Sequence, residues 1–366
     1  MIQSIDIHNF KNLSGLNIPI FSRVNLISGK NNVGKSSLLE ALELNITNSA
    51  LFSILKGRDE IYKTPSPDES AELLKLNIDA LSSLFTARNC NIDDNNVISV
   101  NDGDNAMSIR FVRYEVQMES MENGVSRKRL VLSPDSYSGI DTAIGLEIVR
   151  GAQNRALLPL DRKLYRFGFG ESVQRPDIEN YVVVEPNIDK NQYVSKYWDN
   201  IALTDKEDDV IRALQIIEPG IESLAFLEAP AYRDRYPVVK VKGVKRRLPL
   251  RGMGDGINHI LSIILALVNC ENGCVLIDEI DNGLHYTVQK QLWTVIFDLA
   301  VRLNVQVFAT THSSDCISSF GKVLSMPCNA EVGQYIRLEC RNDKIRAVEY
   351  NADELEIVAA QNIEIR

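Results

Sequence analysis

Residues 29–37 read Gly29-Lys30-Asn31-Asn32-Val33-Gly34-Lys35-Ser36-Ser37 and match the pattern G-x-x-x-x-G-K-[ST] in full. The apolar run Val24–Ser28 directly before them predicts a β-strand. The residues after them predict a helix, because Leu38, Leu39, Leu42 and Ile46 recur on one side. A strand, a glycine-rich loop and a helix in this order form the context in which the pattern binds nucleotide phosphates.

Each residue type in this loop has a chemical reason. Gly29 and Gly34 let the backbone wrap closely, so that successive N–H groups and the helix N-terminus meet phosphate oxygens. Lys35 is expected to reach the β- and γ-phosphates, and the Ser36 hydroxyl to ligate Mg²⁺. Ser37 is expected at the α-phosphate. The predicted cofactors are therefore ATP and Mg²⁺, and the candidate binding residues of the loop are Gly29, Asn31, Asn32, Gly34, Lys35, Ser36 and Ser37.

Two later strands end in polar residues that suit the same chemistry. The buried-type strand Cys274–Ile277 runs into Asp278, a candidate for the magnesium shell, and Glu279, a candidate general base for hydrolysis. One amphipathic helix later, the strand Val305–Thr311 ends at His312.

Five segments of the chain resemble the RecF-like and OLD-like branch of ABC-type ATPases. They are IDIHNFKNLSGL at the N-terminus, GKNNVGKSS, LPLRGMGDG, VLIDEIDNGLHY and VFATTHSSD. The resemblance implies an α/β fold, an ABC-type P-loop ATPase core with a mixed or parallel sheet and flanking helices. It implies a large α+β insertion between the Walker A loop and the signature loop.

The resemblance also implies roles for single residues. Asp278 takes the Walker B position, Glu279 that of the catalytic base, and His312 that of the switch histidine. The signature loop falls on residues 252–256, where Gly252, Gly254 and Asp255 would cap the nucleotide held by a second copy, so a homodimer or higher homo-oligomer is expected. Two features depart from the family: Arg251-Gly252 stands where a serine is usual, and no Q-loop glutamine stands out among Gln117, Gln174 and Gln192.

Lys35 and Asp278 are 243 residues apart, which exceeds what one crossover needs. We expect a discontinuous core over 1–48 and 246–366, and an inserted α+β subdomain with a short helical arm over 49–245. Within it, capping boxes predict helix starts at 66–69 and 204–207, and β-rich runs predict strands over 108–117, 128–133 and 181–185. The Asp- and Asn-rich stretch 91–105 predicts an exposed loop.

The overall composition argues for a cytoplasmic protein without membrane contact. The six cysteines lack paired spacing, and the N-terminus lacks a signal-peptide pattern. The net charge is −9, which gives no global electrostatic case for nucleic acid. Six basic residues nevertheless crowd into 240–251, and they predict either a solvated hairpin or a DNA-facing strand pair.

These features favour an ATP-driven switch that controls a separate effector. Only 54 residues (313–366) follow His312, and they predict two strands and a helix capped by Asn351 and Glu354. OLD relatives carry a Toprim nuclease there, so a nuclease or toxin effector would be a separate chain, with phage defence as the setting that the resemblance implies. A RecF-like DNA-repair ATPase that binds DNA is the alternative. A further alternative is a nucleotide-binding scaffold that hydrolyses ATP very slowly. The ATP-binding subunit of a membrane transporter agrees poorly with the sequence.

Overall fold

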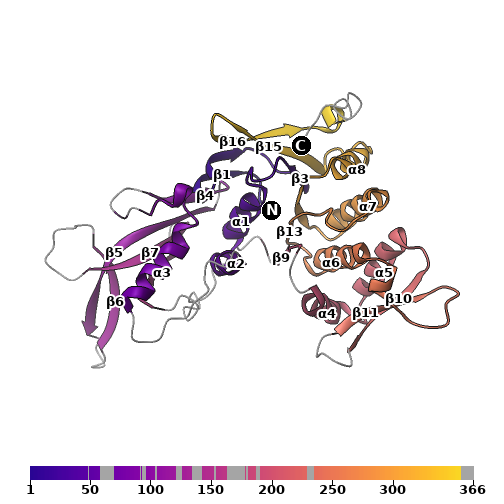
Figure 1. Cartoon of the computed structure of the whole chain (residues 1–366), viewed down its shortest axis with the longest axis horizontal. Helices are drawn as coiled ribbons and strands as arrows, with labels where there is room; N and C mark the ends of the chain where they lie inside the picture. The colour runs from indigo at the N-terminus through magenta and orange to yellow at the C-terminus, as the bar shows by residue number, and fades with distance from the viewer. Residues whose placement is uncertain are drawn as a thin grey trace.

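The computed structural model shows two lobes that meet at the P-loop helix (Figure 1). It describes residues 1–47, 49–57, 70–90, 92, 96–103, 105–120, 126–133, 142–151, 154–162, 178, 180–186, 190–228 and 235–355. Their strands form three sheets, one mostly parallel and two antiparallel. Within this described part, no helix is long and apolar enough to cross a membrane.

The mostly parallel sheet is the centre of the nucleotide core. Its strand order is β16-β15-β3-β14-β13-β9, and only β16 runs antiparallel to its neighbour. The strand bounds are β3 Val24–Ser28, β9 Tyr181–Val184, β13 Cys274–Ile277, β14 Gln306–Thr311, β15 Gly333–Arg341 and β16 Lys344–Tyr350. Every residue of β3, β13 and β14 is buried, which explains why these strands read as continuous apolar runs.

The two faces of this sheet belong to two different hydrophobic cores. Along β13, Val275 and Ile277 pack into one core, while Cys274 and Leu276 pack into the other. This alternation follows from the two-residue side-chain period of a strand. One core is covered by a layer of helices: α4 Lys190–Ile201, α5 Asp205–Ile217, α6 Asp255–Asn269, α7 Tyr286–Arg302 and α8 Ser314–Leu324.

The other core lies beneath α1 and a large antiparallel sheet. Its order is β2-β1-β4-β5-β7-β8, and β6 pairs with the distal half of β5. The strand bounds are β1 Ile5–Phe10, β2 Leu13–Ile18, β4 Ile98–Asn101, β5 Ala106–Ser120, β6 Ser126–Leu132, β7 Ala143–Arg150 and β8 Asn154–Pro159. Helices α1 Lys35–Ile46, α2 Ala50–Gly57 and α3 Ser70–Ser82 belong to this lobe, followed by the one-turn helix η1 Thr86–Arg88.

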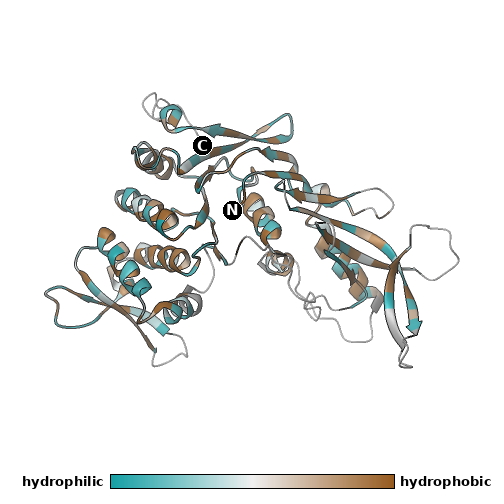
Figure 2. Ribbon diagram, turned by 180° about the vertical axis from the view of Figure 1, so that it is seen from behind, coloured by the Kyte–Doolittle hydropathy of each residue, from teal (hydrophilic) through white to brown (hydrophobic). Residues whose placement is uncertain are grey.

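A small antiparallel sheet completes the helical lobe. It contains β10 Ile221–Glu228, β11 Arg235–Val241 and β12 Leu248–Pro249, and the short helix η3 Leu250–Met253 leads from it into α6. Helix α6 is apolar on most of its surface because it is enclosed by α4, α5, α7 and the sheet (Figure 2).

The structure confirms the expected α/β fold with a mixed sheet and flanking helices. Residues 49–245 are more closely joined to the core than an independent subdomain would be: β9 pairs with β13, and β4 pairs with β1. The domain bounds themselves stay a prediction. The stretch 91–105 contains β4 with Ile98 and Val100 buried, so the expectation of an exposed loop there was wrong in part. The capping box expected at 66–69 lies outside the described residues.

Candidate functional site

The glycine-rich loop connects β3 to α1, and its shape requires two of its glycines. Gly29 has φ 149° and Gly34 has φ 99°. A Cβ added at Gly29 would lie 2.5 Å from the Leu338 carbonyl oxygen, and one at Gly34 would lie 2.9 Å from Leu13 Cδ2. Neither position tolerates a side chain without movement, so the close path of this loop depends on both glycines.

Lys35 lies over the loop that it belongs to. Its Nζ donates hydrogen bonds to the carbonyl oxygens of Gly29, at 2.8 Å, and Lys30, at 3.0 Å. Burial lowers the pKa of Lys35, while the nearby carboxylates of Asp278, Glu279 and Asp281 act in the opposite direction. A phosphate group would add negative charge beside this ammonium group and favour its charged form.

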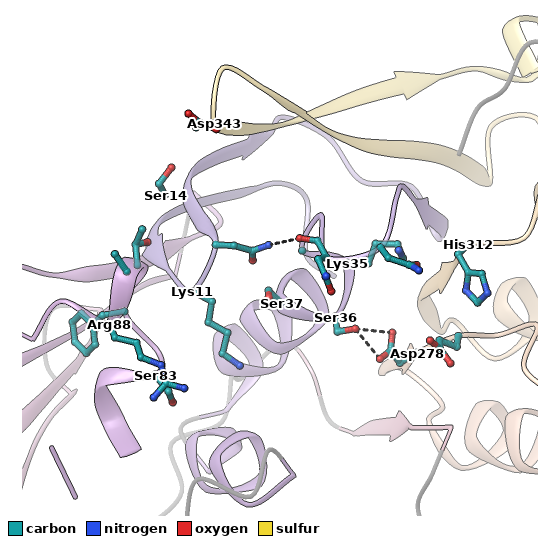
Figure 3. Close-up of a pocket in the computed structure, with 18 residues that line it drawn as sticks. Lys11, Ser14, Lys35, Ser36, Ser37, Ser83, Arg88, Asp278, His312 and Asp343 are labelled. Atoms are coloured by element: carbon teal, nitrogen blue, oxygen red, sulfur yellow. Dashed lines mark hydrogen bonds between the residues drawn. The ribbon is translucent and has the colours of Figure 1, made fainter. Parts of the chain in front are cut away.

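The donor set for a magnesium ion is present at the start of α1. Ser36 Oγ donates to Asp278, at 2.9 Å from Oδ2 and 3.3 Å from Oδ1 (Figure 3). A hydroxyl oxygen and a carboxylate held this close form the hard oxygen set that Mg²⁺ takes in phosphate-binding sites. The residues therefore fit the ion that the sequence predicted.

Thr310, on the neighbouring strand β14, connects the two acidic residues that follow β13. Its Oγ1 donates to Asp278 Oδ1 at 2.5 Å and accepts from the Glu279 N–H at 2.9 Å. One hydroxyl thus fixes both the carboxylate orientation of Asp278 and the backbone of Glu279. Sequence reasoning missed this residue, because within a buried apolar strand Thr310 looks like any β-branched residue.

Glu279 adopts a backbone conformation that is uncommon for a residue with a side chain. Its φ is 50°, in the left-handed region. Such conformations persist where the surrounding structure enforces them, and they gather at catalytic sites. The next residues are fixed as well, because Thr311 Oγ1 donates to Asp281 Oδ1 at 2.5 Å and the Ile280 N–H donates to the Thr310 carbonyl oxygen at 3.0 Å.

A cavity of about 1080 Å³ brings most of the sequence-predicted residues together. Of those residues, its lining includes Asn31, Asn32, Gly34, Lys35, Ser36, Ser37, Asp278, Glu279 and His312. Figure 3 shows His312 and Asp278 at one end and the P-loop in the middle. Gly29 lies beneath the loop rather than in the lining. The carboxyl ends of three parallel strands, β3, β13 and β14, thus converge at this cavity.

The signature-loop residues lie elsewhere. Gly252 lies in η3, Gly254 has φ 113° and precedes α6, and Asp255 is the first residue of that helix. None of the three belongs to the described lining of the cavity. The loop packs on residues that follow β13, since a Cβ at Gly256 would lie 2.7 Å from the Gly283 carbonyl oxygen. Their predicted contact with a nucleotide remains a prediction.

A smaller cavity of about 280 Å³ adjoins the magnesium donor set and is lined by three glutamates that sequence reasoning missed, Glu40, Glu43 and Glu185. Glu185 follows β9, the strand next to β13. Its pKa is raised by burial and by the charges of Asp278 and Glu40. Glu43 on α1 is buried, and burial, together with Glu185 and Glu40, raises its pKa to about 7, although Ser53 donates a hydrogen bond to it. The run Tyr181–Val184 ending in an acid was the available signal.

No glutamine takes the place next to the magnesium donor set among the residues that the structure describes. Gln117 lies on β5, Gln192 lies in α4 and Gln174 is outside the described residues. None of the described residues that line the two cavities is a glutamine.

The chain is similar to several known proteins. A family described as an AAA ATPase domain matches residues 1–122 and 179–317. An ATP/GTP phosphatase of Helicobacter pylori is 27% identical over 346 residues, which is 88% of each chain. An uncharacterised protein of Methanocaldococcus jannaschii is 43% identical over 54 residues, 15% of this chain and 25% of that protein. Among solved structures, an SMC head bound to the C-terminal winged-helix domain of ScpA has a TM-score of 0.49 and 14% identity, with 99% of each chain covered.

Proposed function

The chain belongs to the AAA ATPase domain family and is an ATPase, and on this premise we propose that it is a molecular switch, closed as a dimer by MgATP and reopened by hydrolysis. The observation that carries the proposal is one cavity lined by Lys35, Ser36, Asp278, Glu279 and His312. Hydrolysis of a phosphoanhydride requires several groups in one space, and this cavity contains them: a phosphate ligand, a metal donor set, a general base and a residue at the γ-phosphate end.

In the proposed mechanism, the loop N–H groups and Lys35 hold the phosphates. Ser36 and Asp278 would hold Mg²⁺, which neutralises phosphate charge when bound. Glu279 accepts a proton from the attacking water, and Thr310 positions Glu279 by accepting its backbone N–H. His312, at the end of β14, contacts the γ-phosphate and the water. The H. pylori relative is named for both ATP and GTP, so we propose that either nucleotide is hydrolysed.

We further propose that the signature loop acts in trans across a two-fold axis. Arg251, Gly252 and Gly254 are exposed and outside this chain's cavity, so a second copy can bring them to the γ-phosphate. Gly252 offers a backbone N–H in place of the usual serine hydroxyl, and Arg251 offers positive charge. A homodimer is then the smallest complete enzyme, and higher assembly would use other surfaces.

The test is light scattering after size exclusion with the variant Glu279→Gln. Because this variant keeps the phosphate ligands and lacks the base, it should bind MgATP, hardly turn it over and elute as a dimer. The matched control is the double variant Lys35→Ala with Glu279→Gln, which should remain a monomer. A monomer of Glu279→Gln at saturating MgATP, with nucleotide binding confirmed separately, would contradict the trans arrangement.

We propose that the protein belongs to the OLD-like and RecF-like group and that its dimer controls a separate nuclease or toxin, in the phage-defence setting that this resemblance implies. After His312, the described residues form α8, β15, β16 and a capped turn, with reciprocal hydrogen bonds of 2.9 Å between Asn351 and Glu354. Co-elution of the Glu279→Gln dimer with the product of a neighbouring gene, only with MgATP, would support this role. Binding that ignores MgATP would refute it.

Direct DNA binding is the second candidate, favoured by the basic segment 240–247. Its charged side chains are all exposed, at the end of β11 and in the turn after it: Lys240, Lys242, Lys245, Arg246 and Arg247. Lys240 also pairs with Glu222 at 2.8 Å, as a solvated hairpin would. If the segment contacts phosphates, affinity for a short duplex should fall steeply with salt, by about one power of salt concentration per contact. ATP-dependent dimerisation without duplex binding would exclude this function.

A further inference from the structure

The large cavity extends well past the phosphate loop. At the end remote from His312 and Asp278, it is lined by two groups of residues and by Asp343 (Figure 3). One group, Lys11, Asn12 and Ser14, belongs to the turn between β1 and β2 and to the start of β2. The other comprises Ser83 and residues 85–88. If the γ-phosphate lies near His312, the rest of a bound nucleotide occupies this remote end.

The turn 84–88 is fixed to the nucleotide core by several contacts. The Lys11 N–H donates to the Leu84 carbonyl oxygen at 2.8 Å, and Phe10 and Phe85 form an isolated β-bridge. The turn between β1 and β2 also contacts the P-loop, because Asn12 Nδ2 donates to the Asn32 carbonyl oxygen at 3.1 Å. The η1 turn is therefore held at a set distance from the phosphates.

The same turn carries backbone strain. Ala87 has φ 55° and Arg88 has φ 54°, both in the left-handed region although neither is glycine. In addition, Thr86 Oγ1 is buried with no hydrogen-bond partner. Each strained backbone conformation and each unsatisfied buried hydroxyl lowers the stability of the fold. Such features persist where a site needs a particular backbone shape, and they gather at ligand-binding loops. The strain therefore supports a ligand role for η1.

We propose that Arg88 recognises the base of the bound nucleotide by stacking its guanidinium plane on the purine ring. This inference rests on the proposed nucleotide function and names the residue that holds the nucleoside. Phe85 cannot serve, because it is 1% exposed and stacks on Phe111 at a centroid distance of 5.2 Å. No other Phe, Tyr or Trp is in the described lining, whereas Arg88 is exposed there. A guanidinium group is planar and stacks on π faces.

Stacking does not read the hydrogen-bond pattern of a base, because every base has a π face. We therefore expect ATP and GTP to bind with similar affinity through Arg88. The turn belongs to the segment between α3 and β4, so base recognition also connects the nucleotide to the long excursion between the Walker motifs.

The experiment compares MgATP with magnesium tripolyphosphate, which has the phosphates and no base. Equilibrium binding is measured for four proteins, each carrying Glu279→Gln to suppress turnover: the parent, Arg88→Ala, Arg88→Lys and the control Arg129→Ala. Arg129 lies on β6, is exposed and pairs with the exposed Glu119. Arg88→Ala should weaken MgATP by about 5- to 30-fold, the range of a stacking contact. It should leave tripolyphosphate binding unchanged, and Arg129→Ala should change neither.

Arg88→Lys separates stacking from charge. Lysine keeps the charge without the plane, so it should resemble Arg88→Ala. Equal losses for MgATP and tripolyphosphate, with rescue by lysine, would make Arg88 a phosphate ligand and overturn the proposal. Unchanged MgATP binding by Arg88→Ala would overturn it too. A parent that binds neither probe would instead refute the proposed function itself. In turnover assays without Glu279→Gln, Arg88→Ala should raise KM and preserve kcat.

Discussion

Glu43 of the P-loop helix gives a sharp test of the electrostatics beside the active site. It is buried, and its strongest neighbours of like charge are Glu185 and Glu40. Burial is the main cause that raises the pKa of Glu43 from 4.5 to about 7, and the hydrogen bond from Ser53 only partly opposes it. Between about pH 5 and pH 7, the folded protein therefore holds a proton on Glu43 that the unfolded chain has largely released.

The sign of the pH effect follows from linkage. A carboxyl group whose pKa is higher in the folded state stabilises the fold fully below pH 4.5, and this stability is lost as pH rises through 7. The full shift, at about 1.4 kcal/mol per pKa unit, corresponds to about 3 kcal/mol of unfolding free energy. Most of that loss, about 2 to 3 kcal/mol, falls between pH 5 and pH 8. The glutamine side chain of Glu43→Gln is neutral at every pH, so the variant does not lose this stability.

The assay is urea unfolding of the nucleotide-free protein at both pH values. The difference in unfolding free energy between Glu43→Gln and the wild type should increase by about 2 to 3 kcal/mol in favour of the variant as pH rises from 5 to 8. Glu331→Gln, at an exposed glutamate before β15, is the matched control and should show no such increase. An increase absent from Glu43→Gln as well would refute the reasoning that this buried glutamate is neutral in the fold.

Three further substitutions test the phosphate loop and its supports. Lys35→Ala should abolish ATP binding and turnover, and unchanged hydrolysis would refute the loop assignment. Thr310→Val keeps the side-chain shape and removes the hydroxyl shared by Asp278 and Glu279, so kcat should fall by about 10- to 100-fold; an unchanged kcat would exclude a positioning role. Gly29→Ala places a methyl 2.5 Å from a carbonyl oxygen, so unfolding free energy should fall by about 2 to 4 kcal/mol in a urea titration.

The phosphate site could be predicted from the sequence because its residues follow directly on strands with clear patterns. The P-loop, Asp278, Glu279 and His312 each stand at the end of a buried strand, and parallel pairing of β3, β13 and β14 brings those ends together. The sequence could not identify the hydrogen bonds that side chains on one strand make to site residues on the neighbouring strand. Thr310 acts through hydrogen bonds across β13 and β14, and no spacing along the chain reports such a contact.

The excursion between the Walker motifs was harder to predict, because its short strands gain their stability from partners far along the chain. β4 has four residues between Asp- and Asn-rich flanks, and pairing with β1 and β5 makes it a strand. β9 was expected as a strand over 181–185, but only the structure shows that it extends the parallel sheet beside β13. The sequence analysis also missed helix α8, which follows directly after β14.

A contact at the end of α1 argues that this excursion moves with the phosphate loop. In the middle of the helix, Lys11 of the β1–β2 turn forms a mostly buried ion pair with Glu40. At its end, the Arg150 guanidinium from β7 donates to the carbonyl oxygens of Leu44 and Asn45, which the helix leaves unpaired. Burial lowers the pKa of Arg150 to about 10. Separating β7 from α1 would break these charge-assisted hydrogen bonds, each worth about 1.5 to 3 kcal/mol. We therefore expect a nucleotide that shifts the end of α1 to shift β7 of the antiparallel sheet with it.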